Sequence, residues 1–256
     1  MELHYKKIGE GKPFIILHGL FGSGDNLQSF ARILSTHGFA VYLVDLRNHG
    51  HSPHADEHNY KLMSEDVASF IEQEQLKRPI VFGHSMGGKA AMQLAIDQPT
   101  LLSKLIVVDM APYYYPVQHQ KIIKALQSVD LNQLHTRGEV EKKLAAQIED
   151  VVTRQFLLKN LYWKENNQLA WRFNLPVIAH DIEEMGIAME SETPVLVPTL
   201  FVKGEQSGYI DPSKFESFKK NFPDATLVTV TNAGHWVHAD NAEGLLKVVL
   251  EFVIQN

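Results

Sequence analysis

The sequence predicts an α/β protein with a mostly parallel central sheet flanked by helices. Apolar runs of strand length alternate with amphipathic helical patterns through most of the 256 residues. Several of these runs are apolar at nearly every position, which is typical of parallel strands covered on both faces. A Gly-x-Ser-x-Gly motif stands between one such run and a helical segment. Parallel neighbours need long crossover connections, and the helical segments between the runs supply them.

Up to residue 111, strands and helices are expected in regular alternation. The expected strands are 3–8, 13–17, 39–44, 79–82 and 102–108, and the expected helices are 26–35, 60–75 and 89–96. Apolar residues recur at helical spacing in 60–75. Asp25 is a candidate cap for the first helix, and Pro99 ends the third.

The alternation stops near Pro112 and resumes near residue 193. In between, the patterns predict helices at 118–129, 139–148 and 151–161, and a short hairpin at 163–171 that turns at Asn166 and Asn167. Beyond residue 193 come strands at 198–202 and 225–230 and helices at 211–220 and 242–254. We therefore expect a core of residues 1–111 and 193–256, with residues 112–192 forming a mainly helical lid over one edge of the sheet.

The segment 82–88 reads Phe-Gly-His-Ser-Met-Gly-Gly and joins a predicted strand to a predicted helix. Glycines at 83 and 87 remove side chains that would collide where strand and helix close on each other. Such a tight turn, a nucleophile elbow, presents the Ser85 hydroxyl above the sheet edge and aims a helix N-terminus at developing negative charge. The segment therefore predicts a hydrolytic serine; the alternative is a glycine-rich turn with an exposed serine.

Four further polar residues follow predicted strand ends: His18, Asp45, Asp109 and His235. Ligands of open parallel sheets bind at the carboxyl ends of the strands. One edge of the sheet can therefore gather these four residues around Ser85.

His235 is the best candidate for the base that activates the serine. It lies in a glycine-marked turn beyond the last strand and follows Ser85 in chain order. His238 is the rival, and we interpret it as a packed or capping histidine. His84 is interpreted as a packing residue, because neighbours at an elbow point apart. His18 is expected to hydrogen-bond backbone groups.

The triad acid has three candidates. Asp109 ends the strand that follows the nucleophile strand, and neighbouring strands lie about 4.8 Å apart, so it can reach the same histidine. Asp211 and Glu205 are nearby, each at an awkward offset. Asp109 is favoured over both, against the alternative that it only caps a turn.

Composition excludes several classes of function. The net charge is -6 and no basic stripe is visible, so nucleic acid is not an expected partner. The chain has no cysteine and no tight metal-binding histidine spacing, so neither a metal nor another cofactor is expected. The sequence shows no apolar signal region and no apolar run that could span a membrane, so a cytoplasmic location is expected.

Five segments carry a resemblance to a known family: 18–23, 45–50, 83–89, 171–174 and 234–239. The chain resembles the α/β-hydrolase superfamily over nearly its whole length and, within it, the YbfF-type bacterial esterases. This implies an α/β-hydrolase fold with a helical lid inserted after the sixth strand. The family commonly places its acid near Ser207, where this chain has none; resemblance to the YbfF type favours Asp109.

The backbone amides of Leu20 and Met86 are expected to form an oxyanion hole, with the amide of Phe21 as the alternative to that of Leu20. Of the lid aromatics, Tyr113 and Trp171 are taken as substrate-binding, together with Phe21. Arg47 and Arg172 are interpreted as structural residues rather than anion-binding ones.

The expected activity is that of a cofactor-free serine esterase acting on short acyl esters and, as the resemblance implies, on acyl-CoA thioesters. The alternatives are a carbon–carbon bond hydrolase or lyase, a cofactor-free haloperoxidase, and a non-catalytic ligand receptor. The oligomeric state is not predicted.

Overall fold

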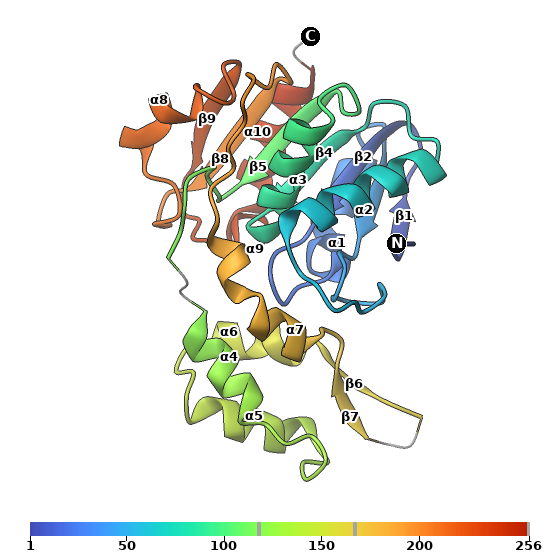
Figure 1. The fold of residues 1–256 in the computed structure, drawn as a ribbon, viewed down its shortest axis with the longest axis vertical. Coiled ribbons are helices and arrows are strands. Elements are labelled where there is room, and N and C mark those ends of the chain that lie inside the picture. Colours follow the sequence, from blue (N-terminus) through green and yellow to red (C-terminus); the bar gives the residue numbers. More distant parts are fainter. Residues whose placement is uncertain (117–118, 166–167, 255–256) are drawn as a thin grey trace.

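Seven strands form one sheet in the order β1-β3-β2-β4-β5-β8-β9 (Figure 1). The computed structural model describes residues 1–116, 119–165 and 168–254. The strands are β1 (Tyr5–Ile8), β2 (Lys12–Leu17), β3 (Phe39–Val44), β4 (Ile80–His84), β5 (Lys104–Val108), β8 (Thr199–Gly204) and β9 (Ala225–Val230). Only β1 is antiparallel to its neighbour, so the predicted mostly parallel sheet is confirmed.

Helices cover both faces of this sheet. The helices α1 (Gln28–Ser35) and α10 (Ala242–Ile254) pack on one face, and α2 (Tyr60–Gln73) and α3 (Met86–Asp97) pack on the other (Figure 1). Of the five interior strands, β3, β4, β5 and β8 are buried at every residue, and β2 is buried along its last four residues. The near-continuous apolar runs in the sequence arise from this double cover.

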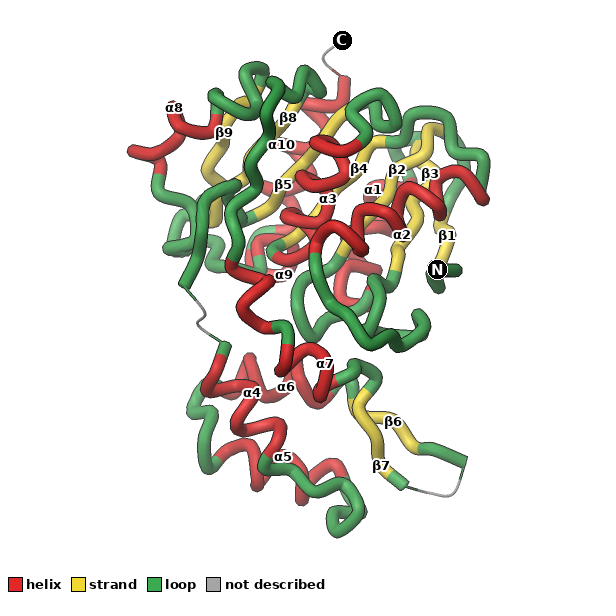
Figure 2. Tube along the Cα trace, viewed as in Figure 1, coloured by secondary structure: helices red, strands yellow, loops and turns green. Residues whose placement is uncertain are grey.

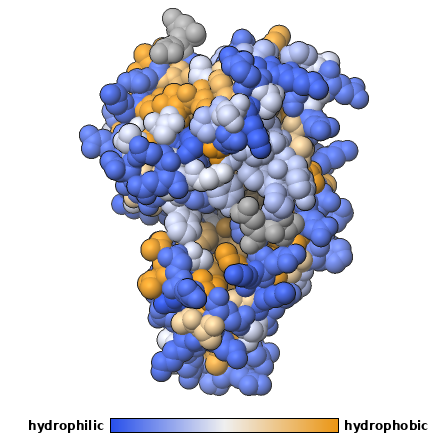
Figure 3. Space-filling model, turned by 90° about the vertical axis from the view of Figure 1, so that its left-hand side faces the viewer, coloured by the Kyte–Doolittle hydropathy of each residue, from blue (hydrophilic) through white to orange (hydrophobic). Residues whose placement is uncertain are grey.

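A second group of elements connects β5 to β8. It comprises α4 (Gln120–Gln127), α5 (Arg137–Ala145), α6 (Val151–Leu158), the hairpin β6 (Leu161–Trp163) and β7 (Leu169–Trp171), α7 (Leu175–His180) and a 3₁₀ helix at Ile182–Gly186. In Figure 2 these elements lie below the carboxyl ends of the strands. Figure 3 shows that apolar and hydrophilic side chains are both exposed on the surface of this second group of elements. The insertion was expected after the sixth strand, but it follows the fifth, β5, so that prediction is wrong. The reason is that a single edge strand, β1, comes before β2.

Several predicted boundaries differ from the observed ones. A 3₁₀ turn at Gly24–Leu27 precedes α1, so Asp25 lies inside it and pairs with Lys6 instead of capping. The helix expected at 211–220 is reduced to a 3₁₀ turn and α8 (Phe215–Phe218). The hairpin turn expected at Asn166 and Asn167, and the start of the helix expected at 118, lie outside the described residues.

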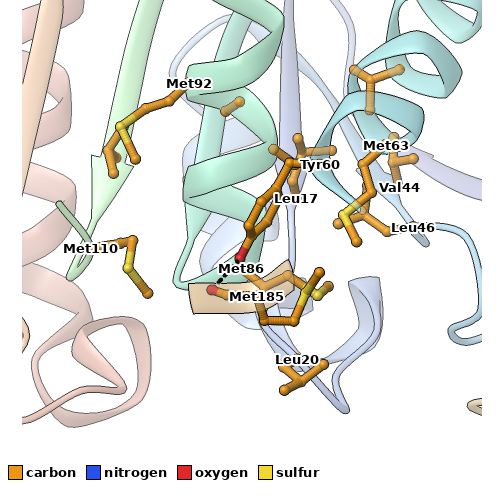
Figure 4. Close-up of a cluster of buried hydrophobic side chains, with 14 of the residues drawn as sticks. Leu17, Leu20, Val44, Leu46, Tyr60, Met63, Met86, Met92, Met110 and Met185 are labelled. Atoms are coloured by element: carbon orange, nitrogen blue, oxygen red, sulfur yellow. Dashed lines mark hydrogen bonds between the residues drawn. The ribbon is translucent and has the colours of Figure 1, made fainter. Parts of the chain in front are cut away.

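The two ends of the insertion are joined to the core by buried polar contacts. The Tyr60 hydroxyl donates to the Met185 carbonyl over 3.0 Å (Figure 4). Lys89, on α3, is fully buried, and its Nζ donates to the carbonyls of Tyr113 (3.3 Å), Gly186 (3.2 Å) and Ile187. Burial lowers the pKa of the Lys89 ammonium to about 7. One lysine of the core therefore holds both the entry and the exit of the insertion.

No helix in the described part of the chain has both the length and the apolar character needed to cross a bilayer.

Candidate active site

Ser85 stands between β4 and α3 in a backbone conformation that side chains rarely adopt, with φ 54° and ψ -118°. The flanking glycines make the turn possible. A Cβ on Gly83 would lie 2.1 Å from the Gly87 carbonyl oxygen, and a Cβ on Gly87 would lie 2.4 Å from that of Leu17. These distances are far below van der Waals contact, so both positions require glycine. The strained elbow predicted from the sequence is present.

The structure brings Ser85, His235 and Asp109 together at the carboxyl edge of the sheet. Ser85 follows β4, Asp109 follows β5, and His235 lies in the loop after β9. The Ser85 Oγ lies 3.0 Å from His235 Nε2, and His235 Nδ1 lies 2.7 Å from Asp109 Oδ2. A carboxylate oxygen accepts, so Nδ1–H donates to Asp109 and Nε2 is left to accept the serine proton. This is the tautomer that a general base needs.

Asp109 is completely buried, and donors hold both of its carboxylate oxygens. The Gly204 amide donates to Oδ1 over 3.0 Å, and the Ser207 hydroxyl donates to Oδ2. The other two candidate acids make contacts elsewhere. Asp211 accepts from the Ser213 amide, and Glu205 accepts from the Asn232 amide.

The remaining histidines near the serine are neutral neighbours of His235. His84 Nε2 lies 2.7 Å from the His235 carbonyl oxygen, so His84 does more than pack. Burial lowers the pKa of His84 well below its usual value and that of His238 to about 4. The His238 ring lies 4.9 Å from that of His84, not on the serine. The Tyr209 ring stacks on His235 at 4.0 Å, a contact that no pattern in the sequence indicates.

The backbone amides expected to bind an oxyanion lie on two segments beside the serine. Leu20 and Met86 both bury their side chains in the apolar cluster of Figure 4. The Phe21 amide donates to His49 Nε2 over 3.1 Å. The Phe21 amide therefore already has a hydrogen-bond partner, which favours the Leu20 amide as the oxyanion donor from this loop.

A cavity of about 430 Å³ opens above Ser85 and is lined mainly by apolar atoms. Core residues beside the triad line its base, and α6 of the insertion lines one side. Phe21 is among the lining residues, and Phe156 of α6 packs its ring 5.6 Å from that of Trp236. Neither Phe156 nor Trp236 could be assigned to the cavity from the sequence, because its patterns do not distinguish aromatics that line a pocket from those that pack.

Trp171 and Tyr113 do not line this cavity. Trp171 stacks on Phe173 at 5.2 Å and borders a separate depression on the insertion, and its indole nitrogen is buried without a partner among the described residues. The Tyr113 hydroxyl donates to the Tyr209 carbonyl over 2.6 Å and accepts from the Asp211 amide over 3.1 Å. Trp171 therefore packs on the insertion itself, and Tyr113 connects the start of the insertion to the loop after β8.

The two arginines have structural partners. Arg47 is buried and forms an ion pair with Asp66, with Nε and Oδ2 2.6 Å apart. The Arg172 guanidinium lies 4.5 Å from the centre of the Tyr162 ring.

One group of potential metal ligands occurs among the described residues: His4, Asp45 and His51. Its carboxylate already accepts hydrogen bonds from the Gly24 amide (2.7 Å) and the His51 amide (2.9 Å), and His4 Nδ1 lies 3.1 Å from it. The arrangement is that of a hydrogen-bonded loop, and we propose no metal there.

Known proteins resemble this chain in both sequence and structure. A family model described as serine aminopeptidase, S33, matches residues 12–242. Esterase YbfF of Escherichia coli (strain K12) is 32% identical over 243 residues, covering 94% of this chain and 92% of that protein. The sn-1-specific diacylglycerol lipase ABHD11 of Xenopus laevis is 37% identical over 250 residues, covering 95% of this chain and 80% of that protein. A solved structure of a marine microorganism esterase has a TM-score of 0.95 and 45% identity, and covers 98% of this chain and 99% of that one.

The relatives are esterases and a lipase that match almost the whole chain, and this chain is a carboxylic ester hydrolase. The parallel sheet, the elbow and the matched family model agree with one another. The chain belongs to the α/β-hydrolase superfamily and, within it, to the YbfF-type esterases.

Proposed function

We propose that the protein is a cofactor-free serine esterase that cleaves short acyl esters through Ser85, His235 and Asp109. The observation that carries this proposal is the continuous hydrogen-bonded chain from the serine hydroxyl to the buried carboxylate, with distances of 3.0 Å and 2.7 Å. A hydroxyl is a weak nucleophile until an oriented base takes its proton, and this chain of contacts meets that need.

In the proposed reaction the Ser85 Oγ attacks the ester carbonyl carbon while His235 Nε2 takes the hydroxyl proton. The carbonyl oxygen becomes an oxyanion, which the amides of Leu20 and Met86 stabilise by about 3 kcal/mol each. His235 then gives its proton to the leaving alkoxide, and an acyl-enzyme remains on Ser85. A water molecule that loses its proton to His235 attacks the acyl-enzyme and releases the acid, which restores the serine.

The cavity supports an acyl group of limited size. Its volume of about 430 Å³ lies in the lower part of the range for ligand pockets, and its lining is mainly apolar. Residues 112–192 would act as a lid whose α6 supplies one wall, and residues 1–111 and 193–256 would act as the catalytic core. Acyl-CoA thioesters fit the same chemistry, because a thiolate leaves in place of an alkoxide. The relation to a diacylglycerol lipase makes glycerides a further class worth testing.

The test is a panel of p-nitrophenyl esters from acetyl to palmitoyl, with acyl-CoA thioesters and a diacylglycerol, for wild type and Ser85→Ala. Turnover of short esters by wild type, lost in Ser85→Ala, is expected, together with labelling of Ser85 by a fluorophosphonate. Saturable ester binding without turnover in wild type would contradict the proposal and indicate a receptor. Cleavage confined to carbon–carbon bonds or to halide oxidation would indicate the other reactions that this scaffold can host.

A further inference from the structure

Two buried histidines that the proposed reaction does not use lie under the loop that approaches the serine. His18 and His49 are both fully buried, and their rings are 5.2 Å apart. His18 directly follows β2 and begins this loop, and His49 belongs to the loop after β3. A Cβ on Gly19 would lie 3.3 Å from the Ser85 Cβ, so the loop passes directly beside the nucleophile.

The backbone partners of the two rings determine their tautomers. His18 Nδ1 lies 2.8 Å from the Gly19 carbonyl oxygen, and its Nε2 accepts from the Leu46 amide over 3.0 Å. His49 Nδ1 lies 3.0 Å from the Arg47 carbonyl oxygen, and its Nε2 accepts from the Phe21 amide. Carbonyl oxygens only accept and amides only donate, so both rings carry their proton on Nδ1 and are neutral. The histidine of each loop therefore accepts a hydrogen bond from a backbone amide of the other loop.

Phe21 is the residue that this arrangement restrains most. Its φ of 58° is unusual for a bulky residue. His49 accepts from its amide, and Asn160 of the insertion donates its side-chain Nδ2 to the Phe21 carbonyl over 2.7 Å. Both polar groups of a strained residue are held, one by the core and one by the insertion. The strained turn persists because its surroundings determine it.

The Phe21 contact also determines which amide the loop can offer to a substrate. Leu20 and Phe21 are adjacent, and the amide of Phe21 is aimed at the His49 ring. Within the described residues, no hydrogen bond uses the amide of Leu20. We infer that His49 is a positioning residue that removes the Phe21 amide from the site and sets the Leu20 amide as the second oxyanion donor. This inference rests on the proposed esterase function.

The experiment compares His49→Leu, which has no acceptor, with His49→Gln, whose side-chain carbonyl can accept from the Phe21 amide. His49→Leu is expected to lower kcat on a short p-nitrophenyl ester by about 10²-fold, the cost of one oxyanion donor, with KM within about 2-fold. An alkyl trifluoromethyl ketone, which forms a tetrahedral oxyanion on the serine, should lose affinity by the same factor. His49→Gln should recover most of kcat.

His58→Leu is the matched control. His58 is also buried, and its ring lies 5.3 Å from that of His49, yet neither ring nitrogen has a hydrogen-bond partner among the described residues. It should keep the wild-type kcat. Equal losses in His58→Leu and His49→Leu, or an unchanged kcat in a folded His49→Leu, would overturn the inference while leaving the esterase proposal intact.

A second measurement decides the matter if His49→Leu does not fold. Nitrogen NMR of the wild-type protein should show His49 protonated on Nδ1 across the range where a free histidine titrates. Protonation on Nε2 would exclude acceptance from the Phe21 amide and overturn the inference. A wild type without turnover or fluorophosphonate labelling would instead contradict the proposed function itself.

Discussion

The floor of the cavity belongs to the sheet edge and is held by hydrogen bonds, whereas one wall is supplied by α6 of the insertion. Ser85, Asp109 and Phe21 all have positive φ, and neighbouring polar groups hold each of them in place. In the α6 wall, Phe156 is placed by packing of its ring on that of Trp236. At the floor, strained backbone places the reacting atoms accurately, and packing suffices where only shape matters.

This difference separates chemistry from selectivity. Substitutions on the floor should change kcat with every substrate, because all esters develop charge at the same atoms. Substitutions in the wall should change kcat/KM according to acyl length. Substitutions at contacts between the core and the ends of the insertion, such as those of Lys89, should change stability.

The largest expected effect is at Asp109. Asp109→Asn would present an amide to His235 Nδ1 and favour the wrong tautomer, so kcat should fall by about 10⁴-fold on all esters, as in other triads. Asp211→Asn is the control, because Asp211 contacts Ser213 and not the histidine. Steady-state kinetics of both variants, with circular dichroism to verify folding, give the answer. If Asp211→Asn lost activity and Asp109→Asn kept it, the acid would be misassigned.

The next effect concerns stability where the core meets the ends of the insertion. Folding lowers the Lys89 pKa from 10.5 to about 7, so between these values the unfolded chain holds a proton that the folded chain has released. The free energy of unfolding should therefore rise with pH across this window, by up to about 1.4 kcal/mol per pH unit, and the gain should vanish below pH ~7.

Lys89→Met tests this prediction, because it keeps a flexible side chain without the titrating group. Urea unfolding at several pH values should give a difference between wild type and variant that grows in favour of wild type as pH rises. Lys219→Met, at an exposed position just after α8, should show no such trend. Parallel curves for wild type and Lys89→Met would show that the buried ammonium keeps its ordinary pKa.

A smaller and substrate-dependent effect is expected in the wall. Phe156→Ala removes an aromatic ring from the cavity, so kcat/KM should fall by about 10-fold for the acyl length that fills it, and by less than about 2-fold for acetyl esters. Trp163→Ala, an exposed aromatic outside the cavity, is the control. A uniform loss across the panel would contradict the separation of floor and wall.

The residues of the cavity floor could be predicted from the sequence better than those of the α6 wall, for a physical reason. Ser85, His235 and Asp109 each follow a strand end, and a parallel sheet brings its carboxyl ends to one edge, so local patterns translate into proximity. Positions such as Ser207 and Tyr209 act through contacts across the loop after β8, which no periodicity encodes. The contact between the Phe21 amide and the His49 ring, on which the proposed choice of oxyanion donor rests, likewise has no signal in the sequence.

For the α6 wall, no comparable rule connects the sequence pattern to the position of a side chain. Aromatic residues recur throughout 112–192, and the sequence does not say whether a ring faces the cavity or another helix. Tyr113 and Trp171 were expected at the substrate and instead bind or pack other elements, whereas Phe156 reaches the cavity from α6. Packing of one amphipathic element on another depends on the whole arrangement of the insertion.

The smallest expected effect is at Trp171, and it tests this distinction directly. Trp171→Phe keeps an aromatic ring to stack on Phe173 and removes an indole N–H that is buried without a partner in the described structure. An unsatisfied buried donor costs about 1–3 kcal/mol, so the variant should be at least as stable as wild type in urea unfolding. Its kcat/KM should stay within about 2-fold for every ester, since the ring lies outside the cavity above Ser85 and one substituted contact of this kind leaves transition-state binding unchanged. A loss confined to long acyl chains would place Trp171 at the substrate after all, and would mean that the insertion moves when an ester binds.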